Sequence, residues 1–86
     1  MLMELKVPKI WIADDDEAIR MVLEEGLKSA GLEIVTFADG ELLIDALNED
    51  KPDLIISDIK MPGMHGYDLL KHIKNNYDKL PVIIMT

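Results

Sequence analysis

The sequence of 86 residues contains no cysteine, so the chain forms no disulfide, no thiolate zinc site and no cysteine nucleophile. Basic residues are also scarce: 9 Lys and Arg stand against 17 Asp and Glu, and the resulting net charge of −8 repels a nucleic-acid backbone. No apolar run approaches the ~20 residues that a membrane helix needs, and residues 1–6 lack the pattern of a signal peptide. The composition therefore predicts a cytoplasmic protein that binds neither nucleic acid directly nor a membrane.

Repeats, low-complexity stretches and linker-like segments are absent, so residues 1–86 predict a single domain. Short apolar runs that end at turn-forming residues predict four strands, at 9–13, 32–37, 54–57 and 82–85. Between them, apolar residues at helical spacing predict three helices; the stripe on the first is Ile19, Val22, Leu23, Gly26, Leu27 and Ala30. Strands that alternate with helices predict a βαβαβαβ order and a parallel sheet, hence an α/β fold.

Polar residues directly follow three of the predicted strands. Asp14, Asp15 and Asp16 come after the first strand, Asp58 ends the third, and Thr86 follows the fourth. In an open parallel sheet the carboxyl ends of the strands share one edge, where ligands bind, so we expect these side chains to converge. Adjacent carboxylates repel one another unless a cation lies between them, and Mg²⁺ accepts one or two carboxylates with water and a phosphate. This edge therefore predicts a Mg²⁺ site.

Simpler interpretations of the same residues stay open. The three consecutive aspartates could merely cap the helix that follows, with Asp15 or Asp16 as the N-cap. Thr86 could be an ordinary β-branched residue at the end of a strand, and Lys60 could contact the site or face solvent. Asp58 differs from the other acids because it follows an apolar strand. A partly desolvated carboxylate beside a metal ion can act as a nucleophile toward phosphorus.

Three segments of the chain resemble the receiver domain of two-component response regulators, in the order and spacing of that family. They are Ile10-Trp-Ile-Ala-Asp-Asp-Asp-Glu-Ala-Ile-Arg20, Pro52-Asp-Leu-Ile-Ile-Ser-Asp-Ile-Lys-Met-Pro-Gly-Met-His-Gly66 and Leu80-Pro-Val-Ile-Ile-Met-Thr86. The sequences of these segments are most similar to those of the nitrogen-regulation class of transcriptional regulators. The resemblance implies a flavodoxin-like fold and a phosphoprotein of phosphorelay signal transduction.

The resemblance also implies a role for each site residue. Asp58 would be the phosphoacceptor, which receives a phosphoryl group from a sensor histidine kinase in a Mg²⁺-dependent reaction. Asp14 and Asp15 would be the acidic pair of the metal site, with Asp58 and the backbone carbonyl of Lys60 as further ligands. Thr86 would be the switch hydroxyl that moves toward the phosphoryl group. A module of this kind is itself modified and is not an enzyme with its own turnover.

The family pattern continues for another helix, a fifth strand with a lysine that pairs with the phosphoryl group, and a fifth helix. This sequence contains none of the three. We therefore expect a C-terminally truncated receiver domain in which phosphorylation of Asp58 is impaired. Its last strand would be an unpaired apolar edge, and such edges pair with other chains. We expect a homodimer or a swapped oligomer formed through this strand.

Two other functions stay open at the level of sequence. One is a phosphatase or phosphotransferase with an aspartyl nucleophile. The Asp-x-Asp spacing common in such phosphatases is absent, because Ile59 and Lys60 follow Asp58. The other is an interaction module that is not phosphorylated, or an engineered fragment of the fold. Sustained release of phosphate from substrates would favour the enzyme.

Overall fold

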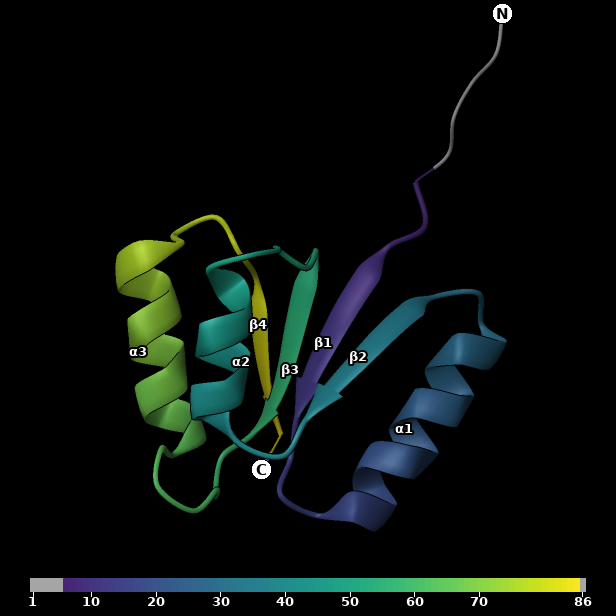
Figure 1. Ribbon diagram of the computed structural model, residues 1–86, viewed down its shortest axis with the longest axis horizontal. Coiled ribbons are helices and arrows are strands. Elements are labelled where there is room, and N and C mark those ends of the chain that lie inside the picture. Colours follow the sequence, from purple (N-terminus) through teal and green to yellow (C-terminus); the bar gives the residue numbers. More distant parts are fainter. Residues whose placement is uncertain (1–5, 86) are drawn as a thin grey trace, which may run out of the picture.

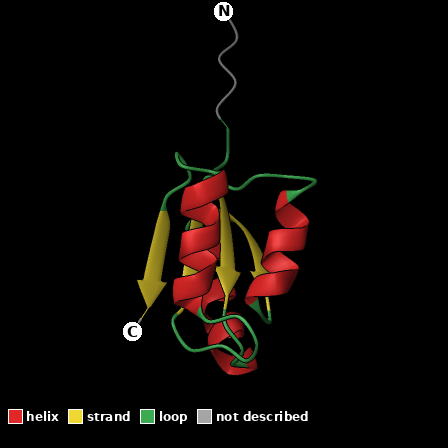
Figure 2. Ribbon diagram, turned by 90° about the vertical axis from the view of Figure 1, so that its left-hand side faces the viewer, coloured by secondary structure: helices red, strands yellow, loops and turns green. Residues whose placement is uncertain are grey.

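The computed structural model describes residues 6–85, which form a sheet with helices on both faces (Figure 1). The strands are β1 (Lys9–Ala13), β2 (Glu33–Phe37), β3 (Leu54–Asp58) and β4 (Val82–Met85). The helices are α1 (Glu17–Ser29), α2 (Gly40–Leu47) and α3 (Gly66–Asn76). The strand order is β2-β1-β3-β4 and every pairing is parallel, so the strands end at one edge (Figure 2). The predicted element order and α/β fold are confirmed.

One face of the sheet carries the larger core, which α2 and α3 cover. Trp11 and Ala13, alternate residues of β1, point to this face together with Ile55 of β3. Leu43 of α2 and Leu69 of α3 pack into the same cluster and are fully buried. This packing holds β1 and β3 side by side, and it thereby fixes where the residues that follow these strands lie.

The opposite face carries a smaller core beneath α1. Ile10 and Ile12 of β1 form this core with Ile34 of β2, and Leu23 and Leu27 of α1 pack against it. α1 lies over β2 rather than over the middle of the sheet (Figure 1). The two faces of β1 are therefore both buried, as its continuous apolar run predicts.

The apolar stripe predicted on α1 is present, but most of it does not reach the core. No residue of α1 is buried, and Val22 is 69% exposed. Ile83 of β4 lies on the same face of the sheet as α1 and is 51% exposed. The periodicity predicted the helix correctly, but α1 sits too close to the β2 edge to bury its whole stripe. Neither α1 nor the other helices within residues 6–85 are long and apolar enough to cross a bilayer.

The ends of α1 follow the sequence signals. Asp16 is the N-cap, and its carboxylate accepts hydrogen bonds from the backbone N–H groups of Ala18 at 2.9 Å and Ile19 at 3.3 Å. Gly31 follows the C-cap with a φ of +88°, the left-handed conformation that glycine adopts without strain. Of the two candidate caps, the structure selects Asp16, so the carboxylate of Asp15 takes no part in the cap.

Candidate metal centre

The carboxyl ends of β1 and β3 bring three acidic side chains together. Ala13 of β1 lies beside Ser57 of β3 in the parallel register, so the next residues, Asp14 and Asp58, are neighbours. Asp14, Asp15 and Asp58 each place a carboxylate oxygen within 4.8 Å of the other two. The expected convergence of these three residues is therefore observed, and helix capping alone does not account for it.

Asp14 is the buried member of the cluster, with 2% of its surface exposed. Burial is the largest influence on this carboxyl and raises its pKa above the usual aspartate value, and the charges of Asp58 and Asp15 raise it further. A 2.9 Å hydrogen bond from the backbone N–H of Asp16 to Oδ1 of Asp14 opposes this rise. A buried carboxylate beside two others favours a cation, because a positive ion offsets their mutual repulsion.

The donor set fits a hard divalent cation such as Mg²⁺. Asp15 is exposed and Asp58 is half-buried, so both remain accessible from solvent. All three groups offer carboxylate oxygens, which are the ligands that Mg²⁺ prefers, and none offers the sulfur or imidazole that softer metals select. The cluster can therefore hold one hard cation and still leave positions for water or for oxygen atoms of a substrate.

Gly66 brings the start of α3 against the end of β3. Its N–H donates a 2.9 Å hydrogen bond to the carbonyl of Ile59. A Cβ atom at position 66 would overlap the carbonyl oxygen of Asp58 and the Cα of Ile59, so a larger residue requires the backbone to move. Sequence patterns do not indicate this contact of Gly66, because the close approach of two backbones has no signature in the hydrophobic pattern.

Arg20 also contacts a residue of the acidic cluster, and sequence patterns did not indicate this contact. Its Nη1 donates a 2.7 Å hydrogen bond to the backbone carbonyl of Asp14. The one feature of the sequence that could have drawn attention to Arg20 is that it is the only arginine among nine basic residues.

Two other predicted site residues remain untested by this geometry. Lys60 follows β3 and is exposed, and the use of its backbone carbonyl as a metal ligand stays a prediction. Thr86 lies outside the described residues, so its role as the switch hydroxyl also stays a prediction.

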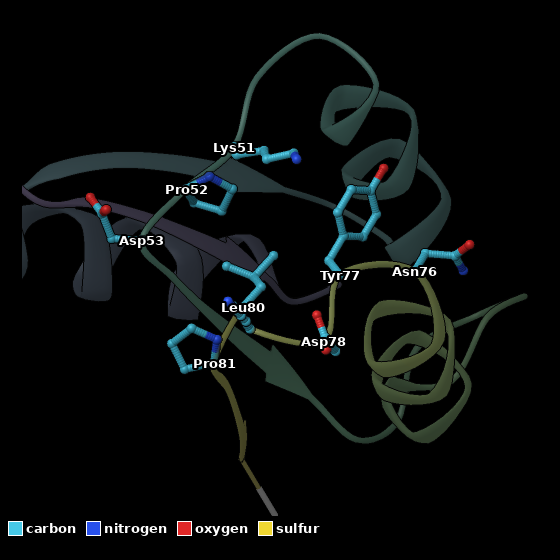
Figure 3. Close-up of a pocket in the computed structure, with 9 residues that line it drawn as sticks. Lys51, Pro52, Asp53, Asn76, Tyr77, Asp78, Leu80 and Pro81 are labelled. Carbon is cyan, nitrogen blue, oxygen red and sulfur yellow. The ribbon is translucent and has the colours of Figure 1, made fainter.

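A pocket of about 440 Å³ lies at the opposite edge of the sheet, where loops lead into β3 and β4 (Figure 3). Lys51 and Pro52 line it on one loop, and Tyr77 and Leu80 line it on the other. Nζ of Lys51 lies 5.2 Å from the centre of the Tyr77 ring. The three carboxylates of the candidate metal centre do not line this pocket, so it takes no part in their chemistry.

Comparisons with known proteins agree on one family. The model of the response regulator receiver domain matches residues 10–86. The DNA-binding transcriptional regulator NtrC of Klebsiella pneumoniae is 55% identical over 76 residues, which cover 88% of this chain and 16% of that protein. The response regulator TrrA of Thermotoga maritima, solved in complex with Mg²⁺-BeF, is 32% identical with a TM-score of 0.87, over 91% of this chain and 68% of that one. A structure described as a transiently phosphorylated "switch" in bacterial signal transduction is 51% identical with a TM-score of 0.78, over 92% and 64%.

A parallel α/β sheet with three carboxylates at its carboxyl edge, matched in fold by these structures, defines a flavodoxin-like signalling domain. The chain belongs to the response regulator receiver domain family. The resemblance seen in its sequence motifs is thus confirmed. The chain spans about a sixth of the length of the NtrC relative, so this membership describes the receiver domain and not the activity of the whole regulator.

Proposed function

We propose that this chain is a phosphoacceptor module in which Asp58 receives a phosphoryl group from a phosphohistidine of a sensor histidine kinase. The observation that carries the proposal is the convergence of Asp14, Asp15 and Asp58 at one edge of the sheet. Asp58 is half-buried there, and the two acids beside it can hold a cation. The family match and the relative described as transiently phosphorylated support this function.

In the proposed reaction, a carboxylate oxygen of Asp58 bonds to phosphorus as the bond between phosphorus and the histidine nitrogen breaks. The nitrogen keeps the bonding electron pair, and the imidazole takes up a proton from solvent. Asp14, Asp15 and Asp58, with the carbonyl of Lys60, would hold Mg²⁺, which supplies positive charge against the phosphoryl oxygens when bound. The hydroxyl of Thr86 would donate a hydrogen bond to a phosphoryl oxygen. Because the acceptor is the chain's own side chain, we propose that the chain is not an enzyme.

Replacement of Asp58 by asparagine is expected to abolish phosphorylation, because an amide oxygen is a far weaker nucleophile than a carboxylate. The test is intact mass spectrometry after incubation with a small phosphoramidate and Mg²⁺. We expect wild type to gain the mass of one phosphoryl group in part of the population, and Asp58→Asn to gain none. Asp45→Asn is the matched control, since Asp45 is an exposed acid on α2.

Three results would contradict the proposal. Equal labelling of Asp58→Asn and wild type would place the phosphoryl group elsewhere. Undiminished labelling after removal of Mg²⁺ with a chelator would contradict the role of the metal. Release of many phosphates per chain from a phosphomonoester would instead indicate an enzyme.

The NtrC relative is named as a DNA-binding transcriptional regulator. We propose that this chain serves as the signal-receiving part of a regulator of that type. The net charge of −8 disfavours direct contact between this chain and DNA, so the proposal places DNA binding elsewhere in such a regulator.

We also propose that the chain self-associates through β4. Within residues 6–85, β4 pairs with β3 alone, its residues carry no charge, and Ile83 is 51% exposed. Ile83→Lys is expected to reduce the dimer fraction in sedimentation velocity, because a charge disfavours burial in an interface. Leu42→Lys is the control, since Leu42 has the same exposed fraction but lies on α2. A wild-type chain that stays monomeric at high concentration would contradict this proposal.

A further inference from the structure

Arg20, the single arginine of the sequence, binds the backbone of Asp14, a residue of the candidate metal centre. Arg20 is half-buried near the start of α1, and its Nη1 donates a 2.7 Å hydrogen bond to the carbonyl of Asp14. Its backbone N–H donates a 3.0 Å bond to the carbonyl of Asp16. The ion pairs found within residues 6–85 both use lysines and do not include Arg20. The guanidinium is therefore directed at a backbone carbonyl rather than at a carboxylate.

This contact completes the anchoring of Asp14. The N–H of Asp14 donates a 3.1 Å hydrogen bond to the carbonyl of Phe37, at the end of β2. Its side chain accepts the bond from the N–H of Asp16, and its carbonyl accepts the bond from Arg20. Both backbone groups and the side chain are thus held. The carbonyl of Asp14 and the N–H of Asp15 belong to one planar peptide unit. The contact with Arg20 therefore also fixes the orientation of the backbone at the start of Asp15.

We infer that Arg20 is a positioning residue for the cation site: it fixes the Asp14–Asp15 peptide so that both carboxylates converge with that of Asp58. This inference rests on the proposed function, because it gives Arg20 a part in the proposed Mg²⁺ site. In this role Arg20 acts through the Asp14 backbone, to which it donates its hydrogen bond, and not as a ligand of the cation. Groups that orient metal ligands in this way commonly change metal affinity by about tenfold or more when they are removed.

The direction in which Mg²⁺ affinity changes when Arg20 is removed distinguishes a positioning role from a purely electrostatic one. The guanidinium of Arg20 bonds to the Asp14 carbonyl and so lies near the candidate cation site, where its positive charge repels a cation and lowers the affinity of the site. If Arg20 acted through its charge, its removal would tighten Mg²⁺ binding. If Arg20 orients the ligands, its removal weakens Mg²⁺ binding although a positive charge is lost.

The test is the Kd of Mg²⁺, measured by titration of the fluorescence of Trp11, which is buried three residues before Asp14. We expect Arg20→Ala to raise the Kd roughly tenfold. Lys28→Ala removes one positive charge from an exposed position on the same helix and is expected to leave the Kd unchanged. Arg20→Lys keeps the charge but offers a point donor in place of the planar fork, so we expect a Kd between those of wild type and Arg20→Ala. Thermal unfolding of each variant shows whether it is folded.

The outcomes are distinguishable. A Kd that is unchanged or lower in a folded Arg20→Ala variant overturns the inference while the proposed function stands. If Arg20→Ala does not fold, Arg20→Lys decides, and a wild-type Kd in that variant overturns the inference. A wild-type chain that does not respond to Mg²⁺ overturns the proposed function and, with it, this inference.

Discussion

Replacement of Gly66 by alanine is expected to lower the free energy of unfolding by about 3 kcal/mol and to disrupt the candidate metal centre. The added Cβ would overlap the carbonyl oxygen of Asp58 and the Cα of Ile59. Both are backbone atoms, so no side-chain rotation relieves the overlap, and the start of α3 must move away from β3. That movement breaks the hydrogen bond from Gly66 N–H to the Ile59 carbonyl and shifts Asp58.

Gly26→Ala is the matched control for this experiment. Gly26 lies inside α1, and a Cβ there would meet no atom within 4 Å. Alanine is favoured over glycine inside a helix, so this variant is expected to gain about 0.5–1 kcal/mol. Urea unfolding followed through Trp11 measures both changes. A Gly66→Ala chain that unfolds at the wild-type midpoint would contradict the close approach of α3 to β3.

Replacement of Asp14 by asparagine is expected to stabilise the metal-free chain and to abolish its stabilisation by Mg²⁺. The asparagine oxygen can still accept the hydrogen bond from the N–H of Asp16, but the buried negative charge is gone. Burial raises the pKa of Asp14, which means that ionisation of this carboxyl costs more in the folded chain than in the unfolded chain. Removal of the charge removes that cost, and it also removes a proposed ligand of the cation.

The pH dependence of this difference follows from the raised pKa. Below the ordinary aspartate pKa of about 4, Asp14 is protonated in both folded and unfolded chains and contributes nothing to the difference. As the pH rises through the unfolded-state pKa toward the folded-state pKa, the unfolded chain releases its proton first and wild type loses stability. The advantage of Asp14→Asn should therefore be present at neutral pH and vanish in acid.

Thermal unfolding without metal, at neutral and acidic pH, measures this advantage. Asp45→Asn again serves as the control, because it removes an exposed charge from α2. The opposite result would be an Asp14→Asn chain that, without metal at neutral pH, is less stable than wild type. It would show that the folded chain stabilises the ionised carboxylate of Asp14 despite its burial. Retention of the full Mg²⁺ response would contradict the proposed role of Asp14 as a metal ligand.

Most of the fold could be predicted because its signals are local. β1 and β3 are short apolar runs that end at acids, and the alternation of strands with helices dictates a parallel sheet. The same topology predicts the convergence of Asp14, Asp15 and Asp58, since parallel strands end at one edge. The exposure of Val22 could not be predicted. Periodicity tells which residues share a face of α1, but not how far along the sheet that helix sits.

The contacts that Gly66 and Arg20 make with residues of the site could not be predicted from the sequence, for a different reason. The approach of Gly66 to Asp58 and the bond from Arg20 to Asp14 both involve backbone atoms, which every residue possesses. A backbone acceptor has no side-chain signature, so neither pattern nor composition marks it. The sequence shows Gly66 and the single arginine, Arg20, but the backbone groups that they contact can be identified only in the folded chain.

We propose that the three carboxylates form one cation site that prepares Asp58 for phosphorylation. Thermal unfolding of wild type with and without Mg²⁺, followed through Trp11, tests it most directly. At a Mg²⁺ concentration of one hundred times its Kd, we expect a stabilisation of about 2.7 kcal/mol, which raises the unfolding midpoint by roughly 10 °C or more for a domain of this size. The shift should saturate and should be lost in Asp58→Asn. A cooperative transition whose midpoint does not move with Mg²⁺ would show that the three carboxylates do not form a cation site.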